Sequence, residues 1–234
     1  MPSTTLSACD SGVGVKNGIN YFGKKNFTGV FDPPYAVVND LSLLTTLDDR
    51  HWRAGLSEAI KVALVLDGCF FETIESYVSQ LVKRDSDAIE AIVRHSATLH
   101  FQHITEGGDP FERLDARPLD FGHWAAHKLE QLSNYEITHG EAVSIGLAID
   151  LRCSVLLGHI DDAQAMRVID LLKALGLPTS HALMEDSALL DGIEEFREHL
   201  GGELTLLMLK GIGQPVTVHE LDHEIVQQAL RKLL

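Results

Sequence analysis

Three histidines and one glutamate between residues 123 and 139 carry the clearest chemical pattern in the chain. His123 and His127 are four residues apart, so on a helix their imidazoles share a face, and Glu130 follows on the same stripe. His139 comes after a polar break at residues 133–135 and opens a second apolar helical run. Two helices joined by a short turn lie antiparallel, which lets His139 return to the level of His123. Imidazole nitrogens and carboxylate oxygens bind zinc readily. The spacing therefore allows a metal site, and the alternative is a set of ordinary surface or core histidines.

The pattern leaves the set of ligands incomplete. A catalytic metal keeps three protein ligands and one open position, so a carboxylate from elsewhere in the chain is expected to complete the set. The zincin motif is excluded because glutamate does not follow His123 directly. Gly122 and Gly140 each flank a histidine, and glycine lets the backbone approach a ligand closely.

The periodicity of apolar residues predicts a mainly helical chain around these residues. Residues 35–41 are β-branched and apolar and predict a short buried strand. Residues 204–210 and 215–221 predict a small hairpin, and residues 1–30 are typical of irregular loop. The predicted helices cover residues 50–66, two segments within 68–104 that break near Asp85–Asp87, the two histidine segments, 161–175 ending at Gly176, 191–200, and a last helix from Asp222.

A glycine- and lysine-rich stretch near the start is a second candidate binding element. Gly12, Gly14 and Gly18 surround Lys16, and lysine charge with close backbone approach suits a phosphate or a dinucleotide. No strand precedes it as a Rossmann fingerprint requires, and it is not a Walker loop. A merely flexible loop fits this stretch equally well.

Glu58 and Lys61 lie three residues apart in an otherwise apolar helix. A surface ion pair is the simpler interpretation, and the residues alone favour it. Buried among apolar neighbours, the same pair would be costly unless it served a ligand.

Composition limits the classes of function. The 234 residues are 45% hydrophobic and 23% charged, with a net charge of −15, which argues against a nucleic-acid or membrane-surface role. Three scattered cysteines without a CxxC motif predict reduced thiols in the cytoplasm. We see no signal peptide and no apolar run long enough to cross a membrane.

Four sequence blocks resemble the 3-dehydroquinate synthase family and the wider sugar-phosphate cyclases. FGHWAAHKLE and HGEAVSIGL are similar to the family's FGHxxGHxxE and HGExVxIGM, with the same spacing from His123 to His139. RAGLSEAIK resembles RAGLAEVIK, and DSGVGVKNGIN…GKKN resembles DSSVGGKTGIN…GKN. The resemblance implies that Glu58 is the missing carboxylate, so that Glu58, His123 and His139 bind zinc or cobalt.

The same resemblance implies a lyase that uses NAD and cyclises a sugar phosphate with loss of phosphate, the substrate being 3-deoxy-D-arabino-heptulosonate 7-phosphate or a related sugar phosphate. The implied catalytic residues are Asp10, Lys16, Lys61, Arg117, Asp120 and His127. The implied NAD-binding residues are Asp10, Lys16, Lys25, Asn26, Thr46 and Leu47, although Thr46 also fits simple helix capping.

Several departures from the family pattern suggest an altered substrate. Gly12 and Val15 replace a serine and a glycine, and Asp120 stands where the synthases have asparagine, with Arg117 one residue closer to the histidines. The family's cleft lysine near residue 100 is not found, and His100 or His103 falls near its place. Arg197 falls near another lysine of the family.

The family's enzymes begin with a nucleotide-binding domain, and Met1–Thr5 resembles only its end. We therefore expect residues 1–40 to be an α/β remnant of that domain with the cleft loop, and residues 41–234 to be the helical metal and substrate domain. We further expect either a homodimer or a partner that supplies the nucleotide-binding half. Two alternatives stay open: a metal- and NAD-dependent polyol dehydrogenase of the glycerol type, and an inactive or split metal-binding helical module.

Overall fold

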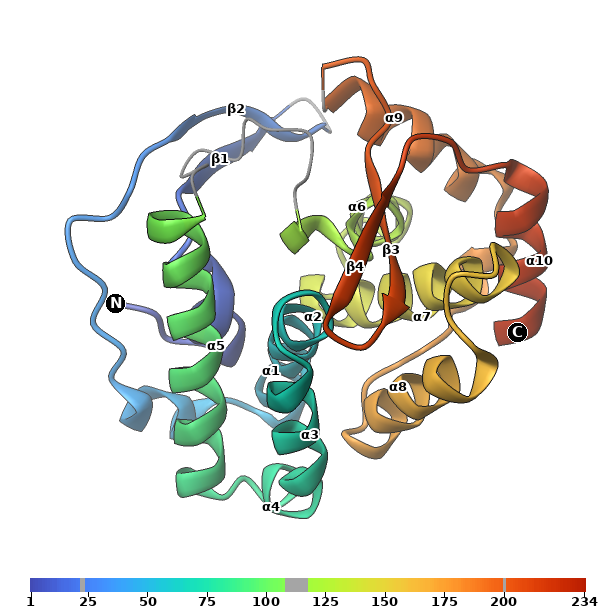
Figure 1. Cartoon of the computed structure of the whole chain (residues 1–234). Helices are drawn as coiled ribbons and strands as arrows, with labels where there is room; N and C mark the ends of the chain where they lie inside the picture. Colours follow the sequence, from blue (N-terminus) through green and yellow to red (C-terminus); the bar gives the residue numbers. More distant parts are fainter. Residues whose placement is uncertain (22–23, 108–117, 200) are drawn as a thin grey trace.

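The computed structural model describes residues 1–21, 24–107, 118–199 and 201–234, with only the backbone of residues 20, 24–27, 31, 118 and 199 (Figure 1). The first half contains the π-helical turn η1 (Ser7–Ser11), strands β1 (Lys16–Tyr21) and β2 (Lys24–Phe31), the 3-10 helix η2 (Leu41–Thr46), and helices α1 (Asp49–Ala54), α2 (Leu56–Leu66), α3 (Gly68–Ser76), α4 (Val78–Val82) and α5 (Ser86–Glu106). The second half contains η3 (Pro118–Asp120), α6 (His123–Leu132), α7 (His139–Leu156), α8 (Asp162–Ala174), η4 (Ala182–Glu185), η5 (Ser187–Leu190), α9 (Asp191–His199), strands β3 (Leu206–Gly211) and β4 (Gln214–Val218), and α10 (His223–Leu233).

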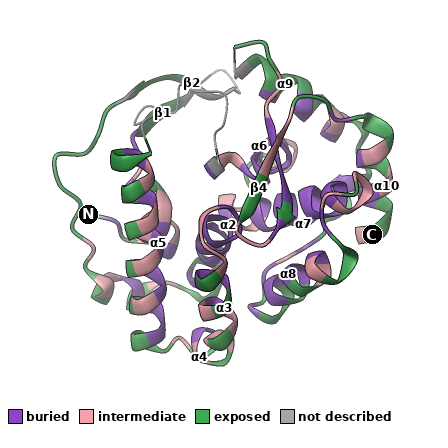
Figure 2. Ribbon diagram, in the orientation of Figure 1, coloured by how far each residue is buried: buried purple, intermediate pink, exposed green. Residues whose placement is uncertain are grey.

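Helices α2 and α7 form the centre of the core. Every residue from Leu56 to Val65 is buried, and α7 is buried without interruption from Ala142 to Ser154 (Figure 2). A helix that is apolar on all sides must be covered on all sides. Helices α2, α6, α8 and α10 and strand β3 pack around α7 and supply that cover.

Glycines allow two close contacts that set the position of α7. A side chain at Gly146 would place its Cβ 1.9 Å from the carbonyl oxygen of Gly122, and one at Gly140 would come 2.0 Å from that of Ala54. Gly122 itself has φ +78°, which favours glycine. The start of α6 and the end of α1 therefore touch the backbone of α7 directly.

The mainly helical architecture and the hairpin near the C-terminus are confirmed, and β3 pairs antiparallel with β4 from Leu206↔Val218 to Gly211↔Gln214. The last helix begins after Asp222, whose side chain accepts a hydrogen bond from Glu224 N. The predicted helix over 50–66 is divided at Gly55 into α1 and α2. A Cβ at Gly55 would lie 2.1 Å from Leu6 N, so the N-terminal segment crosses at this point.

Two predictions for the N-terminal region are wrong. Residues 1–30 were expected to be irregular, but they form η1 and the antiparallel pair β1–β2, with Lys16 opposite Phe31 and Ile19 opposite Thr28. The glycines and asparagines concealed the β-branched and aromatic residues of these strands. Residues 35–41 were expected to be a strand. They contain no strand, and Leu41 already belongs to η2. Neither of the two sheets in the described part of the chain pairs with this segment, so its backbone has no strand to bond with there.

Cys9, Cys69 and Cys153 are free thiols. Among the helices in the described residues, none combines the length and the apolar character needed to cross a bilayer.

Candidate metal centre and its cleft

Three elements bring the predicted ligands together. Glu58 lies in the first turn of α2, His123 is the first residue of α6, and His139 is the first residue of α7. Helices α6 and α7 run in opposite directions, so that Glu130 faces His139 and Gly122 faces Gly146. The ring centroids of His123 and His139 are 5.4 Å apart.

The facing atoms of the three residues lie at distances that suit one small ion. Glu58 Oε1 is 3.2 Å from His139 Nε2 and 3.8 Å from His123 Nε2. One possible ligand atom from each residue falls within 4.8 Å of the others. Two ligand atoms of a tetrahedral zinc ion lie about 3.3 Å apart, because each bond measures about 2.0–2.1 Å.

Hydrogen bonds at the far side of each ring decide which nitrogen faces inward. His123 Nδ1 lies 3.1 Å from the carbonyl oxygen of Phe121, which only accepts, so Nδ1 carries the hydrogen. His139 Nδ1 lies 3.0 Å from the carboxylate of Glu130 and donates in the same way. Burial, together with the positive charge of Lys61, holds the pKa of His123 well below its usual range. The Nε2 atom of His123 therefore presents a lone pair toward Glu58.

Glu58 is fully buried, and neither of its carboxylate oxygens has a partner with hydrogen-bond geometry in the described part of the chain. The ammonium of Lys61 is an ion-pair partner, 2.6 Å from Oε2, outside the angular range of a hydrogen bond. Two imidazole lone pairs and a carboxylate oxygen that point at one another repel unless a cation lies between them. The donor set and its spacing fit a divalent metal such as zinc or cobalt.

A second group of charges lies beside these ligands. Lys61 Nζ is also 3.4 Å from Asp10 Oδ1, and His100 Nδ1 is 3.1 Å from the same oxygen. Burial acts to raise the pKa of Asp10, but the charges of Lys61 and His100 overcome it and hold this pKa well below its usual range. Burial likewise acts to lower the pKa of Lys61, and the carboxylates of Asp10 and Glu58 raise it instead. Both groups are therefore charged at neutral pH.

Asp10, Lys61 and His100, together with the ligands His123 and His139, line a cavity of about 260 Å³. On its outer side Lys16 Nζ lies 3.1 Å from Asp120 Oδ1, and the side chain of Lys16 is 44% exposed. The wall is made by Asp10, Ser11, Gly14, Val15, Lys16, Lys61, His100, Ile104, Leu119, Asp120, His123, His127, His139 and Phe196.

The structure brings most of the predicted site residues to this cavity, but not all of them. Thr46 and Leu47 lie at the end of η2 and before α1, outside the lining residues, and Thr46 Oγ1 donates to Leu43 O. Arg197 lies on the surface, where it pairs with Glu194. Arg117 and the side chains of Lys25 and Asn26 lie outside the described residues.

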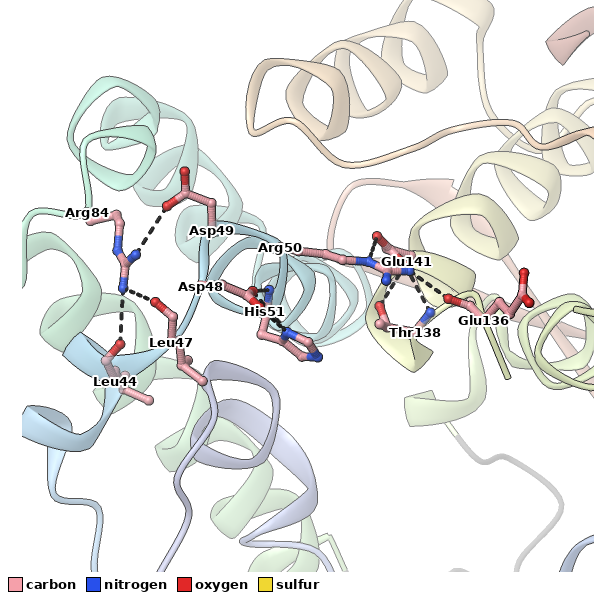
Figure 3. A network of polar contacts seen from close by, with 10 residues as sticks. All are labelled: Leu44, Leu47, Asp48, Asp49, Arg50, His51, Arg84, Glu136, Thr138 and Glu141. Atoms are coloured by element: carbon pink, nitrogen blue, oxygen red, sulfur yellow. Dashed lines mark hydrogen bonds and ion pairs between the residues drawn. The ribbon is translucent and has the colours of Figure 1, made fainter. Parts of the chain in front are cut away.

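Two features near the ligands were missed in the sequence. Asp150 is buried on α7 and accepts hydrogen bonds from Trp124 Nε1 at 2.7 Å and Gly122 N at 2.8 Å, so it fixes both neighbours of His123. Burial raises the pKa of Asp150 to about 7 against the effect of these bonds. An aspartate within the apolar run 142–153 was the available signal. The other feature is a bidentate pair between Arg50 and Glu141, two residues beyond His139 (Figure 3).

Comparison with known families gives a consistent result along the chain. Residues 55–197 match the family described as 3-dehydroquinate synthase C-terminal, and residues 1–54 match the one described as 3-dehydroquinate synthase N-terminal. A 3-dehydroquinate synthase from Halorhodospira halophila is 34% identical over 231 residues, covering 98% of this chain and 65% of the relative. A 2-epi-5-epi-valiolone synthase from Streptomyces glaucescens is 32% identical, covering 99% of this chain and 60% of the relative.

Solved structures agree with this assignment. A 2-epi-5-epi-valiolone synthase from Streptomyces hygroscopicus, with NAD⁺ and Zn²⁺ bound, matches with a TM-score of 0.92 and 29% identity, covering 99% of this chain and 64% of that one. A 2-deoxy-scyllo-inosose synthase shares the fold, with a TM-score of 0.78 at 20% identity, covering 100% of this chain and 66% of that one. The chain thus spans somewhat less than two thirds of the length of the curated relatives it matches. The metal-ligand geometry, the fold and the two matched domains together show that this chain belongs to the 3-dehydroquinate synthase family.

Proposed function

We propose that this chain supplies the metal- and substrate-binding part of an NAD-dependent lyase that cyclises a phosphorylated sugar with loss of phosphate. The observation that carries the proposal is the convergence of His123 and His139 on the buried carboxylate of Glu58, whose oxygens accept no hydrogen bond among the described residues. The two histidines also line a cavity that contains lysine side chains. A divalent ion held there would supply Lewis acidity toward substrate hydroxyl groups, and NAD a reversible hydride acceptor.

The residues of the cavity suit the other tasks of such a reaction. Lys16 is half-exposed at the cavity and can pair with a phosphate, while Lys61 is fixed below it and stabilises negative charge that develops on the substrate. Asp10, beside His100 in the wall, can orient a substrate group, and His127 offers an imidazole that can move a proton. Arg117 remains a candidate for binding phosphate by its resemblance to the family.

The substrate is proposed only as a class, a sugar phosphate such as 3-deoxy-D-arabino-heptulosonate 7-phosphate or a related compound. Relatives of similar identity are named for different cyclases, as 3-dehydroquinate synthase and as 2-epi-5-epi-valiolone synthase. Asp120 places a carboxylate in the wall next to Lys16, which reduces the positive charge available for an acidic substrate.

The site for NAD is incomplete among the residues described. Asp10 and Lys16 lie at the cavity, whereas Thr46 and Leu47 lie outside it. We therefore propose that NAD binds between this chain and a nucleotide-binding half, carried by a longer chain or a partner, and that the division near residue 40 separates the two functional parts. We propose a cytoplasmic setting for this enzyme, in keeping with its free thiols.

Metal binding by the chain itself is the first test. Co²⁺ titration followed by visible absorption should give one bound ion for the wild-type chain, and Glu58→Ala, His123→Ala and His139→Ala should each weaken binding at least 100-fold. His219→Ala changes an exposed histidine beyond β4 and serves as the matched control. Unchanged binding in the three ligand variants would refute the metal centre.

A second assay separates the cyclase from a polyol dehydrogenase, which has no need for the lysines at the cavity. The enzyme completed with its nucleotide-binding half is incubated with NAD and the candidate sugar phosphates. Phosphate release without net NADH formation supports the cyclase, and NADH formation from a simple polyol supports the dehydrogenase. A lack of both activities in a fully folded, metal-loaded assembly would favour a binding module.

A further inference from the structure

We propose that Arg50 and Glu141 are positioning residues that hold the metal ligand His139 in place relative to Glu58. The inference rests on the proposed metal centre and adds to it a pair of supporting residues outside the cavity. Neither residue lines the cavity beside the ligands.

The contact between Arg50 and Glu141 joins two helices with good geometry. Arg50 Nε donates to Glu141 Oε1 at 2.7 Å, and Nη2 donates to Oε2 at 2.7 Å (Figure 3). Nη2 also donates to the carbonyl oxygen of Glu136, again at 2.7 Å. A bidentate guanidinium–carboxylate pair fixes both distance and direction. The pair therefore connects α1 with the turn before α7 and with the first turn of α7 itself.

Glu141 passes this constraint to the residue that precedes the ligand. Its Oε2 accepts hydrogen bonds from both the backbone N and the Oγ1 of Thr138, each at 2.9 Å. Thr138 is the N-cap of α7, and His139 is the first residue of the helix. A glutamate bonded back to the N-cap backbone fixes where a helix begins and the direction in which it enters. The backbone from which the imidazole of His139 projects is thus held by Glu141.

The same short helix leads to the other ligand. α1 ends at Ala54, whose carbonyl oxygen would be only 2.0 Å from a Cβ at Gly140, so α1 and the start of α7 are in backbone contact. α1 continues through Gly55 into α2, where Glu58 lies in the first turn. Arg50 and the Gly140 contact therefore fix the start of α7 against the helix that leads to Glu58. Because the ligand atoms of Glu58 and His139 are 3.2 Å apart, a shift of about 1 Å at this junction would leave the tolerance of a metal site.

The chain offers a matched control in a second arginine that braces α1. Arg84 Nη1 donates to Asp49 Oδ1 at 3.1 Å, and Nη2 donates to the carbonyl oxygen of Leu47 at 2.7 Å (Figure 3). Its guanidinium also lies over the ring of Trp52, 4.9 Å from the centroid. None of these contacts reaches α7. Loss of Arg84 therefore removes a brace on α1 but leaves the contacts of Arg50 and Glu141 with the start of α7 in place.

The experiment is a Co²⁺ titration of the metal-free chain, with the visible absorption spectrum and the melting temperature of each metal-free variant recorded. Arg50→Ala and Glu141→Ala should each raise the dissociation constant about tenfold, in the range known for groups that orient metal ligands, and change the absorption bands. Arg84→Ala should bind Co²⁺ with a dissociation constant within about twofold of the wild type. This should hold even if its melting temperature falls by as much as that of Arg50→Ala. The double variant Arg50→Ala/Glu141→Ala should bind about as weakly as Glu141→Ala alone, because both act along one path.

Two results would overturn the inference and leave the metal centre intact. In the first, Arg50→Ala binds Co²⁺ with wild-type affinity and an unchanged spectrum. In the second, Arg50→Ala and Arg84→Ala lose affinity equally and in proportion to their loss of melting temperature, which marks a general structural role. Failure of the wild-type chain to bind Co²⁺ would instead remove the metal centre, and the positioning role with it.

Discussion

The region built by α2, α6 and α7 differs sharply from the N-terminal region of residues 16–40 in what it buries. In the helical region even charged groups are buried, and Glu58, Lys61 and Asp150 have exposed fractions of 0%, 1% and 2%. In the N-terminal region it is the apolar side chains that are exposed, with Tyr35 at 107% and Ile19 at 65%. The helical region therefore determines its own conformation through packing and hydrogen bonds. In the N-terminal region few of the described side chains are packed against the rest of the chain.

The largest predicted effect tests the cost of the charge buried in the helical region. Burial raises the pKa of Asp150 to about 7, against about 4 in an unfolded chain. Because the folded pKa is the higher one, the carboxyl group contributes stability that is fully present below about pH 4 and is lost as the pH rises through about 7. The slope reaches about 1.4 kcal/mol per pH unit, or about 4 kcal/mol in total.

Asp150→Asn isolates this effect, since the amide has nearly the same shape and does not titrate. Urea unfolding of the metal-free wild type and of Asp150→Asn between pH 5 and pH 8 gives the difference in unfolding free energy. That difference should shift in favour of the variant as the pH rises. Parallel profiles would show that Asp150 keeps an ordinary pKa and that burial around it is less complete.

The difference between the two regions also explains how far the sequence could predict the site. His123, His127 and Glu130 follow helical spacing, and His139 begins the next apolar run. Local periodicity was therefore sufficient to place these four residues on two adjacent helices. The structure then brought Glu58, His123 and His139 together as the family resemblance implied. The strands of residues 16–31 were missed because glycine and asparagine hid the alternation. Asp150 contacts Trp124 across 26 residues and Arg50 contacts Glu141 across 91 residues, and periodicity does not reveal such pairs.

The second prediction concerns the two hydrogen bonds that Asp150 accepts. Asp150→Ala leaves Trp124 Nε1 and Gly122 N buried without an acceptor, and each unsatisfied donor costs about 1–3 kcal/mol. Asp150→Asn retains one acceptor oxygen. Neither variant carries a charge at this position. At pH 5 the free energy of unfolding of Asp150→Ala should therefore be about 2 kcal/mol lower than that of Asp150→Asn. Equal stability of the two variants would mean that neither bond contributes.

The smallest effect is expected in the N-terminal region, at Tyr35 and Val38. Tyr35 is fully exposed and Val38 is 56% exposed, so Tyr35→Ser and Val38→Thr remove little buried apolar surface. Each should leave the melting temperature of the chain within about 2 °C of the wild type. Val143→Ala, at a fully buried position of α7, is the matched contrast and should lower the melting temperature by about 5 °C or more, because it leaves a cavity in the core. A loss at Tyr35 as large as that at Val143 would show that residues 35–40 are packed in solution, and the difference between the two regions would disappear.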